Sequence, residues 1–175
     1  MDLKKETEIV LRDAGFETWP WENGPVPVVC FENDASLGFV HFFDGAVELQ
    51  EGWQGAQDAS LARFTLALRG AGEKAWNVYA IFLAKEPADD GSVASLDRIE
   101  ENFSYTRKIV RAGIRSQEEL TGALLPLLPI RNSPRIDASN FEARLDAALQ
   151  KIHPKGGRAL LGNAKPVDIA QILAE

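Results

Sequence analysis

Four segments of the chain carry the apolar patterns that β-strands require. Residues 37–43 (LGFVHFF) are apolar on both faces that a strand would present, which predicts a strand in the middle of a sheet. Residues 76–84, rich in aromatic and β-branched side chains, predict a fully buried strand. Residues 26–31 predict a strand that either lies at a sheet edge or begins at Pro27. Residues 46–49 predict a short strand after the hairpin signal Asp-Gly.

Other segments repeat their apolar residues every three or four positions, which predicts helices. Asp58 has the chemistry of an N-cap, and Ser116 with Glu119 fits a capping box. The tryptophans and prolines of residues 19–25 predict irregular chain. The helical periods cover, in order, residues 3–14, 58–68, 96–110, 141–152 and 166–174, and a capped helix opens at Ser116.

The order of these elements predicts an α+β fold. We expect a small, mainly antiparallel sheet covered by helices, with a helical C-terminal half. The loop at residues 87–92, which is rich in proline, aspartate and glycine, marks the internal boundary. It separates a sheet-containing half, residues 1–86, from a helical half, residues 87–175, and we expect the two to pack as one compact domain.

Charge and composition narrow the class of protein. The 175-residue chain has a net charge of −7, which argues against a general nucleic-acid binder because such proteins are basic overall. The single cysteine, Cys30, cannot form a disulfide within the chain, so a reducing compartment is expected. No apolar stretch reaches the roughly 20 residues of a membrane span, and residues 1–8 lack the apolar core of a secretory leader. We therefore expect a cytoplasmic protein without membrane contacts.

Four carboxylates on or beside the predicted strands offer one alternative function. A metal-dependent nuclease of the restriction-endonuclease type places acids and a Glu-x-Lys motif on neighbouring strands, where they bind Mg²⁺ and activate water. The α-β-β-β-α-β order predicted for residues 3–84 resembles that arrangement. The motif is missing, because residues 48–50 read Glu-Leu-Gln, and acids at turns also occur for backbone reasons. The carboxylates of this alternative are Glu32, Asp34, Asp44 and Glu48.

The remaining reactive side chains form no catalytic motif. His41 lies alone in an apolar strand, and His153 also lacks a second ligand at metal-binding spacing. Cys30 is typical of a small buried hydrophobe. The glycines at residues 70–72 and 156–157 match no nucleotide-binding loop, so helix ends are the favoured interpretation.

Cations gather at the end of the helix predicted over residues 96–110. Arg107, Arg111 and Arg115 are spaced four residues apart, with Lys108 beside the first, so on a helix they would share one side. Two interpretations remain open. The cations could dock an acidic partner or phosphate groups, or they could simply stabilise the negative end of the helix dipole.

An apolar segment broken by proline follows, at residues 124–130 (LLPLLPI). It is too apolar for a solvated loop, and Pro126 prevents a helix from continuing through it. The segment packs either on the protein's own sheet or against a partner.

The sequence RIEENFSYTRKIV at residues 98–110, followed by LLPLLP at residues 124–129, resembles the middle-component proteins of prokaryotic ABC-three-component systems. These small proteins accompany an ABC-type ATPase and a third, effector-type component. The resemblance covers less than a quarter of the chain, and residues 78–83 fit it loosely. It implies an accessory subunit of a mobile-element or antiviral defence cassette that links the ATPase to the effector. It implies no cofactor, no catalytic residues and only indirect contact with nucleic acid.

The sequence therefore favours a non-enzymatic subunit that binds other proteins through a basic and apolar helical face. Besides the nuclease, a small-ligand sensor is a further alternative, with a pocket walled by Trp19, Trp21, Trp53 or Trp76. Glu100, Arg107 and Lys108 are expected to be exposed. The candidate partner-binding residues are Glu100, Phe103, Arg107, Lys108, Arg111, Arg115, Leu127 and Leu128.

Overall fold

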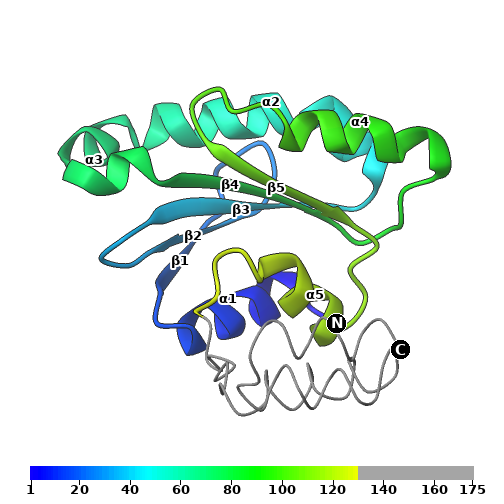
Figure 1. The fold of residues 1–175 in the computed structure, drawn as a ribbon, viewed down its shortest axis with the longest axis horizontal. Coiled ribbons are helices and arrows are strands. Elements are labelled where there is room, and N and C mark those ends of the chain that lie inside the picture. Colours follow the sequence, from blue (N-terminus) through cyan, green and yellow to red (C-terminus); the bar gives the residue numbers. More distant parts are fainter. Residues whose placement is uncertain (130–175) are drawn as a thin grey trace, which may run out of the picture. The chain divides into compact units, whose positions relative to one another are not determined.

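A computed structural model describes residues 1–129, in which a five-stranded sheet lies between two layers of helices (Figure 1). Strands β1 and β2 and strands β2 and β3 pair antiparallel, whereas β3 and β4 and β4 and β5 pair parallel. The predicted α+β class is confirmed, but the sheet is mixed rather than mainly antiparallel. The strands lie side by side in chain order: β1 Glu17–Trp21, β2 Val28–Glu32, β3 Leu37–Phe43, β4 Val78–Ala84 and β5 Arg107–Ala112.

Helices cover both faces of the sheet, which explains why its central strands are apolar on both sides. One face packs against α1 (Leu3–Asp13) and α5 (Gln117–Leu124). The other packs against α2 (Ala46–Arg63), α3 (Thr65–Gly70) and α4 (Asp90–Glu100). A short 3-10 helix, Gly72–Trp76, leads into β4. Every residue of β3 is buried, as its sequence predicts.

Several local predictions are confirmed. The first helix and the buried strand at residues 37–43 are present. The strand predicted at residues 76–84 is present as β4 from Val78 onward, but Trp76, which was expected to be buried, lies before it and is exposed. Ser116 caps α5: its hydroxyl accepts from the Glu119 N–H at 3.2 Å, and the Glu119 carboxylate accepts from the Ser116 N–H at 2.9 Å. Hydrogen bonds from the N–H groups of Arg115 and Ser116 lower the pKa of Glu119.

The strand predicted at residues 46–49 is wrong, because these residues form the first turn of α2. Ala46, Leu49 and Ala56 are buried at helical spacing, so one stripe continues along the whole helix. Gly45 is the extended N-cap, and Asp58, expected as the N-cap, lies inside the helix.

The irregular chain predicted at residues 19–25 is wrong in part, because Trp19 to Trp21 belong to β1. This strand lies at the sheet edge, where Pro20 is tolerated because only some N–H groups take part in pairing. Pro27 precedes β2, which lies between β1 and β3, so its role is that of an entry residue.

The helix predicted over residues 96–110 is also wrong beyond Glu100, where α4 ends. Residues 107–112 form β5 and pair with β4, so the boundary expected at residue 87 does not separate sheet from helices. The contacts instead divide the chain after Pro129. The helices predicted at residues 141–152 and 166–174 lie outside the described residues.

Candidate functional site

The loop from Glu101 to Thr106, which we call the presenting loop, joins α4 to the edge strand β5. Asn102 Oδ1 accepts from the Ser104 N–H, and the Thr106 N–H donates to the Ser104 carbonyl, both at 2.9 Å. Tyr105 has a φ of 68°, a left-handed conformation that costs a residue with a side chain roughly 1–2 kcal/mol. The loop therefore keeps a defined shape that local preference alone does not favour.

Lys108 fixes the presenting loop from the protein interior. Its ammonium donates to the carbonyls of Asn102 at 2.6 Å and Ser104 at 2.9 Å, and the Thr106 carbonyl is at 3.4 Å. The side chain is buried, which lowers its pKa, and its ammonium lies 5.6 Å from the centre of the Trp53 ring. A buried ammonium needs acceptors, and here the acceptors are main-chain oxygens of the loop. The charge of Lys108 therefore contributes to the shape of the loop and is not displayed to solvent.

A second contact joins the presenting loop to α2. Thr106 and Gln57 are both buried, and the Thr106 hydroxyl donates to Gln57 Oε1 at 2.8 Å. Among residues 1–129, no buried side-chain nitrogen or oxygen lacks a hydrogen-bond partner. The loop is thus attached to α2 as well as to β5.

Fixed in this way, the presenting loop directs two aromatic side chains into solvent. Phe103 is 77% exposed and Tyr105 is 80% exposed, and Trp76, which is 87% exposed, lies beside them. Together with Arg107 they line a hollow of about 260 Å³ at the amino ends of β4 and β5. We call these four residues the aromatic patch. Single exposed apolar residues are normal, but three aromatic rings and an arginine around one hollow have the composition of protein-binding hot spots.

Glu100 and Arg111 close the free edge of β5. Glu100 Oε1 accepts from the Arg111 guanidinium at 2.7 Å and from the Val110 N–H at 3.3 Å. It thereby occupies a main-chain donor of an edge strand that could otherwise pair with another chain. Both side chains are half-buried. Within residues 1–129, their ion pair covers the edge of β5.

The eight residues predicted to bind a partner do not form one face. Because β5 is a strand and not a helix, Arg107 and Lys108 point to opposite faces of the sheet. Leu127 and Leu128 are half-buried and pack on the cluster beneath α1 and α5, so they face the protein's own core. Arg115 is exposed in the loop before α5. Of the eight, the structure brings Phe103 and Arg107 together in the aromatic patch and places Lys108 behind it.

Sequence reasoning missed Trp76 and Tyr105 as members of this surface. Tyr105 was hidden by the helical spacing of its apolar neighbours. The adjacent apolar pair Ile109 and Val110 fits a helix as well as a strand, and only the structure shows that both are buried in β5. A strand there makes the residues before it a loop.

The four carboxylates of the nuclease alternative lie at opposite ends of β3. Glu32 pairs across from Leu37 at the start of β3, whereas Asp44 follows its end. Seven strand residues separate them by about 20 Å, far beyond the reach of one Mg²⁺ ion. Asp44 instead pairs with Lys85 at 2.8 Å, and Glu48 accepts from the Asp44 N–H. The observed order of α1, β1 to β3, α2 and β4 has the predicted sequence of element types, but one strand differs: β1 precedes the two predicted strands, and the strand predicted at residues 46–49 is helical. These acids cannot form a common metal site.

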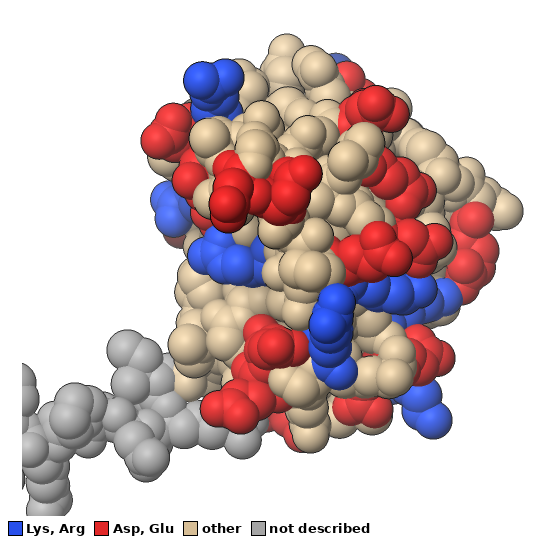
Figure 2. All heavy atoms as spheres, turned by 90° about the vertical axis from the view of Figure 1, so that its right-hand side faces the viewer, with Lys and Arg blue, Asp and Glu red and all other residues tan. Residues whose placement is uncertain are grey.

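The face at the carboxyl ends of β3 to β5 is where parallel sheets usually bind ligands. Figure 2 shows this side of the molecule, where acidic and basic side chains are interspersed and the acidic ones cover more of the surface. Within residues 1–129, no group of three histidine, cysteine or acidic side chains could hold a metal ion.

The four tryptophans of the sensor alternative do not wall one pocket. Trp19 lines a hollow of about 290 Å³ beside α3, and Trp21 packs edge-on against Phe64 at 5.8 Å. Trp53 lines a separate cleft between α2 and the presenting loop, and Trp76 belongs to the aromatic patch. The sensor alternative needs only one tryptophan at a pocket, and Trp19 and Trp53 each line one, so it stays a prediction.

His41 and Cys30 are buried core residues. His41 Nε2 lies 3.0 Å from Ser60 Oγ and Nδ1 lies 3.4 Å from the Ile81 carbonyl, and burial lowers the pKa of His41 to about 4. Both His41 and Ser60 have no accessible surface, so no substrate reaches them. Burial raises the pKa of Cys30 to about 12, which leaves the unreactive thiol. His153 and the glycines at residues 156–157 lie outside the described residues.

Neither a family model, nor a curated protein, nor a solved structure matches this chain. Within residues 1–129, none of the helices combines the length and the apolar character that a bilayer crossing requires. The candidate site is therefore defined by its own geometry, namely a fixed loop with exposed aromatic rings.

Proposed function

We propose that the protein is a non-enzymatic accessory subunit that binds a partner protein through the aromatic patch. The observation that carries this proposal is the use of Lys108. Burying an ammonium group costs free energy of folding. The hydrogen bonds of this ammonium hold a loop from which the rings of Phe103 and Tyr105 project into solvent. A fold that needed only a connection between α4 and β5 would gain nothing from exposing them.

The energetics of association support the same proposal. Ordering a loop during binding costs roughly 1–2 kcal/mol per residue in main-chain entropy. The presenting loop is already ordered by Lys108 and Gln57, so a partner would not bear that cost. The left-handed conformation of Tyr105 adds strain at an exposed ring, and strain in structures concentrates at binding and active sites.

The family resemblance supplies the partners to test. It implies an ABC-type ATPase and an effector component, with the present chain as the link between them. Direct binding of nucleic acid is not favoured, because the chain is acidic overall and Arg111 and Lys108 are already engaged within the protein. No cofactor is part of this proposal.

The test is affinity purification of the tagged full-length chain from its native host, with quantitative mass spectrometry of the proteins recovered. The double variant Phe103→Ser with Tyr105→Ser removes both rings. The matched control is Val47→Ser, which changes a 61% exposed apolar residue in the first turn of α2, away from the patch. We expect stoichiometric recovery of an ABC-type ATPase and a third component with the wild type and the control, and loss of both with the double variant. Recovery of the chain alone, or a complex that the double variant leaves intact, would refute the proposal.

A further inference from the structure

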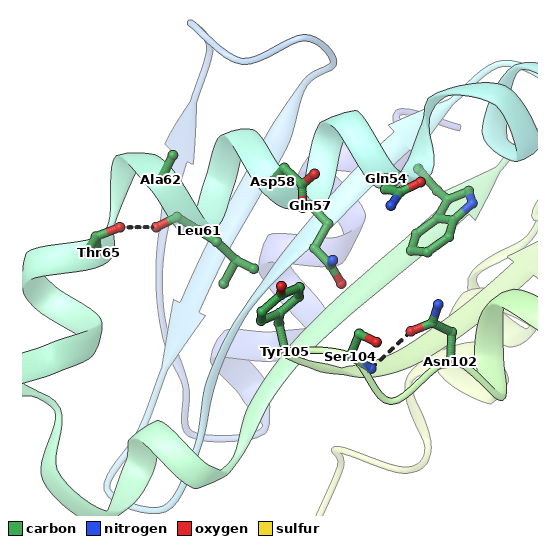
Figure 3. Close-up of a pocket in the computed structure, with 10 residues that line it drawn as sticks. Gln54, Gln57, Asp58, Leu61, Ala62, Thr65, Asn102, Ser104 and Tyr105 are labelled. Carbon is green, nitrogen blue, oxygen red and sulfur yellow. Dashed lines mark hydrogen bonds between the residues drawn. The ribbon is translucent and has the colours of Figure 1, made fainter.

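A second hollow lies next to the aromatic patch, between α2 and the presenting loop (Figure 3). It has a volume of about 600 Å³. Figure 3 shows Tyr105 beneath α2, with its hydroxyl toward the helix, and Gln57 reaching from the helix toward the loop. Tyr105 lines both this cleft and the hollow of the aromatic patch, so the two separate hollows are neighbours that share one side chain.

The cleft is lined by polar side chains, two aromatic rings and the apolar Leu61 and Ala62, and by no basic side chain. Asp58 is its one charged residue, exposed on α2. None of the ion pairs among residues 1–129 uses Asp58. Lys108 is within electrostatic range of this carboxylate, but its ammonium is directed to the loop carbonyls. A carboxylate without an ion-pair partner, in a cleft bordered by rings, favours an organic cation.

The polar groups of the cleft suit a planar cation with several donors. The Gln54 amide is exposed on α2, and the Asn102 amide and the Ser104 hydroxyl are on the loop side. A guanidinium carries five N–H donors in one plane and stacks on aromatic faces, whereas an ammonium does neither. One face of Trp53 already contacts Lys108, so the Tyr105 ring is the surface left for stacking.

We propose that this cleft receives an arginine side chain of the partner protein, with its guanidinium between the Tyr105 ring and the Asp58 carboxylate. The inference rests on the proposed function and adds the chemistry of the partner. A partner segment that covers Phe103 and Trp76 would lie next to the cleft, because Tyr105 borders both hollows. The acidic net charge of the chain favours a basic partner surface here.

The first experiment needs no partner. The full-length protein is titrated with N-acetyl-arginine methylamide and followed by NMR, with N-acetyl-citrulline methylamide as an uncharged probe of the same shape. We expect saturable shifts at the amides of Gln54, Asp58 and Tyr105, with binding about fivefold weaker for citrulline and for Asp58→Asn. The matched control is Glu51→Gln, which removes one exposed charge from the same helix outside the cleft and leaves arginine binding unchanged.

The second experiment introduces Asp58→Asn and Glu51→Gln into the complex recovered from the host. We expect Asp58→Asn alone to lower the recovery of the partner about fivefold. Equal shifts with arginine and citrulline, no shift with arginine, or full recovery of the partner with Asp58→Asn would each overturn the inference. If Phe103→Ser with Tyr105→Ser abolishes the complex while Asp58→Asn does not, the proposed function stands and the arginine site falls. If no partner is recovered but the arginine probe binds through Asp58, the proposed function fails and the cleft retains its preference for cations.

Discussion

Replacing Lys108 by methionine tests the central structural argument, because it removes the ammonium and retains most of the side-chain volume. The two short hydrogen bonds, at 2.6 and 2.9 Å, each contribute about 1.5–3 kcal/mol net, since their donor is charged. The variant also avoids the burial of a charge, the effect that lowers the pKa of Lys108, and this gain offsets part of the loss. We expect the free energy of unfolding to fall by about 2–3 kcal/mol.

Urea unfolding measures this change, and amide hydrogen exchange locates it. In Lys108→Met, exchange at Ser104 and Thr106 is expected to accelerate, because the loop loses the contact that fixes its carbonyls. Amides in β4 are expected to accelerate only as far as the global stability falls. Lys74→Met is the matched control: Lys74 lies 3.9 Å from Glu32 at the surface, and its loss is expected to change stability by no more than about 0.5 kcal/mol.

Two results would refute the reasoning about Lys108. A loss of stability as small as that of the control would mean that the hydrogen bonds of Lys108 contribute nothing beyond solvation. Rapid exchange of the Ser104 and Thr106 amides in the wild type would mean that the presenting loop is not ordered before binding. Either result would also remove the main support for the proposed function.

Three further predictions concern the fold. Lowering the pH from 7 to 5 is expected to reduce the free energy of unfolding by about 2 kcal/mol, because His41 has a pKa of about 4 in the folded protein and an ordinary value of 6.5 in the unfolded chain. Urea titrations of His41→Gln are expected to lack this part of the pH dependence. Gly38→Ala places a Cβ 2.5 Å from the Tyr79 carbonyl oxygen and is expected to lower the free energy of unfolding by about 2–3 kcal/mol. Gly55→Ala, whose Cβ has nothing within 4 Å, is expected to raise it by about 0.5–1 kcal/mol, and equal melting temperatures of the two variants would contradict this. Ser116→Ala removes the cap of α5 and is expected to cost about 1 kcal/mol by thermal unfolding, and no change would show that Glu119 caps the helix alone.

The central strands of the sheet could be predicted from the sequence because a strand that is buried on both faces consists almost entirely of apolar residues. All seven residues of β3 and six of the seven in β4 are buried, so these segments had to be apolar throughout. The sequences of the edge strands show a weaker apolar pattern. Strand β1 has one neighbour, contains Pro20 and has no buried residue, so nothing in its sequence distinguishes it from a loop.

The candidate site could not be predicted because one apolar spacing fits two structures. Leu96, Ile99 and Val110 are all buried, and a helix through residues 96–110 would place them on one stripe. The actual chain leaves the helix after Glu100 and returns as a strand. Phe103, taken as part of the stripe, is consequently exposed. Of the four cations, Arg107 and Arg111 share one face of β5, Lys108 lies on the other face, and Arg115 lies beyond the strand. Tertiary pairing with β4 decided between the two structures, and a single sequence does not contain that pairing.

The segment that carries the family resemblance can be divided into residues that the fold uses and residues that it does not. Ile99, Ile109 and Val110 are buried in the core, whereas Glu100 and Arg111 close the strand edge and Lys108 orders the loop. Each of these has a structural reason to be where it is. Phe103 and Tyr105 have none: their rings are directed into solvent by a loop that a buried charge holds in place, and Tyr105 is strained there. Because folding does not explain these two aromatic side chains, they are the positions at which a selected binding function has to be sought first.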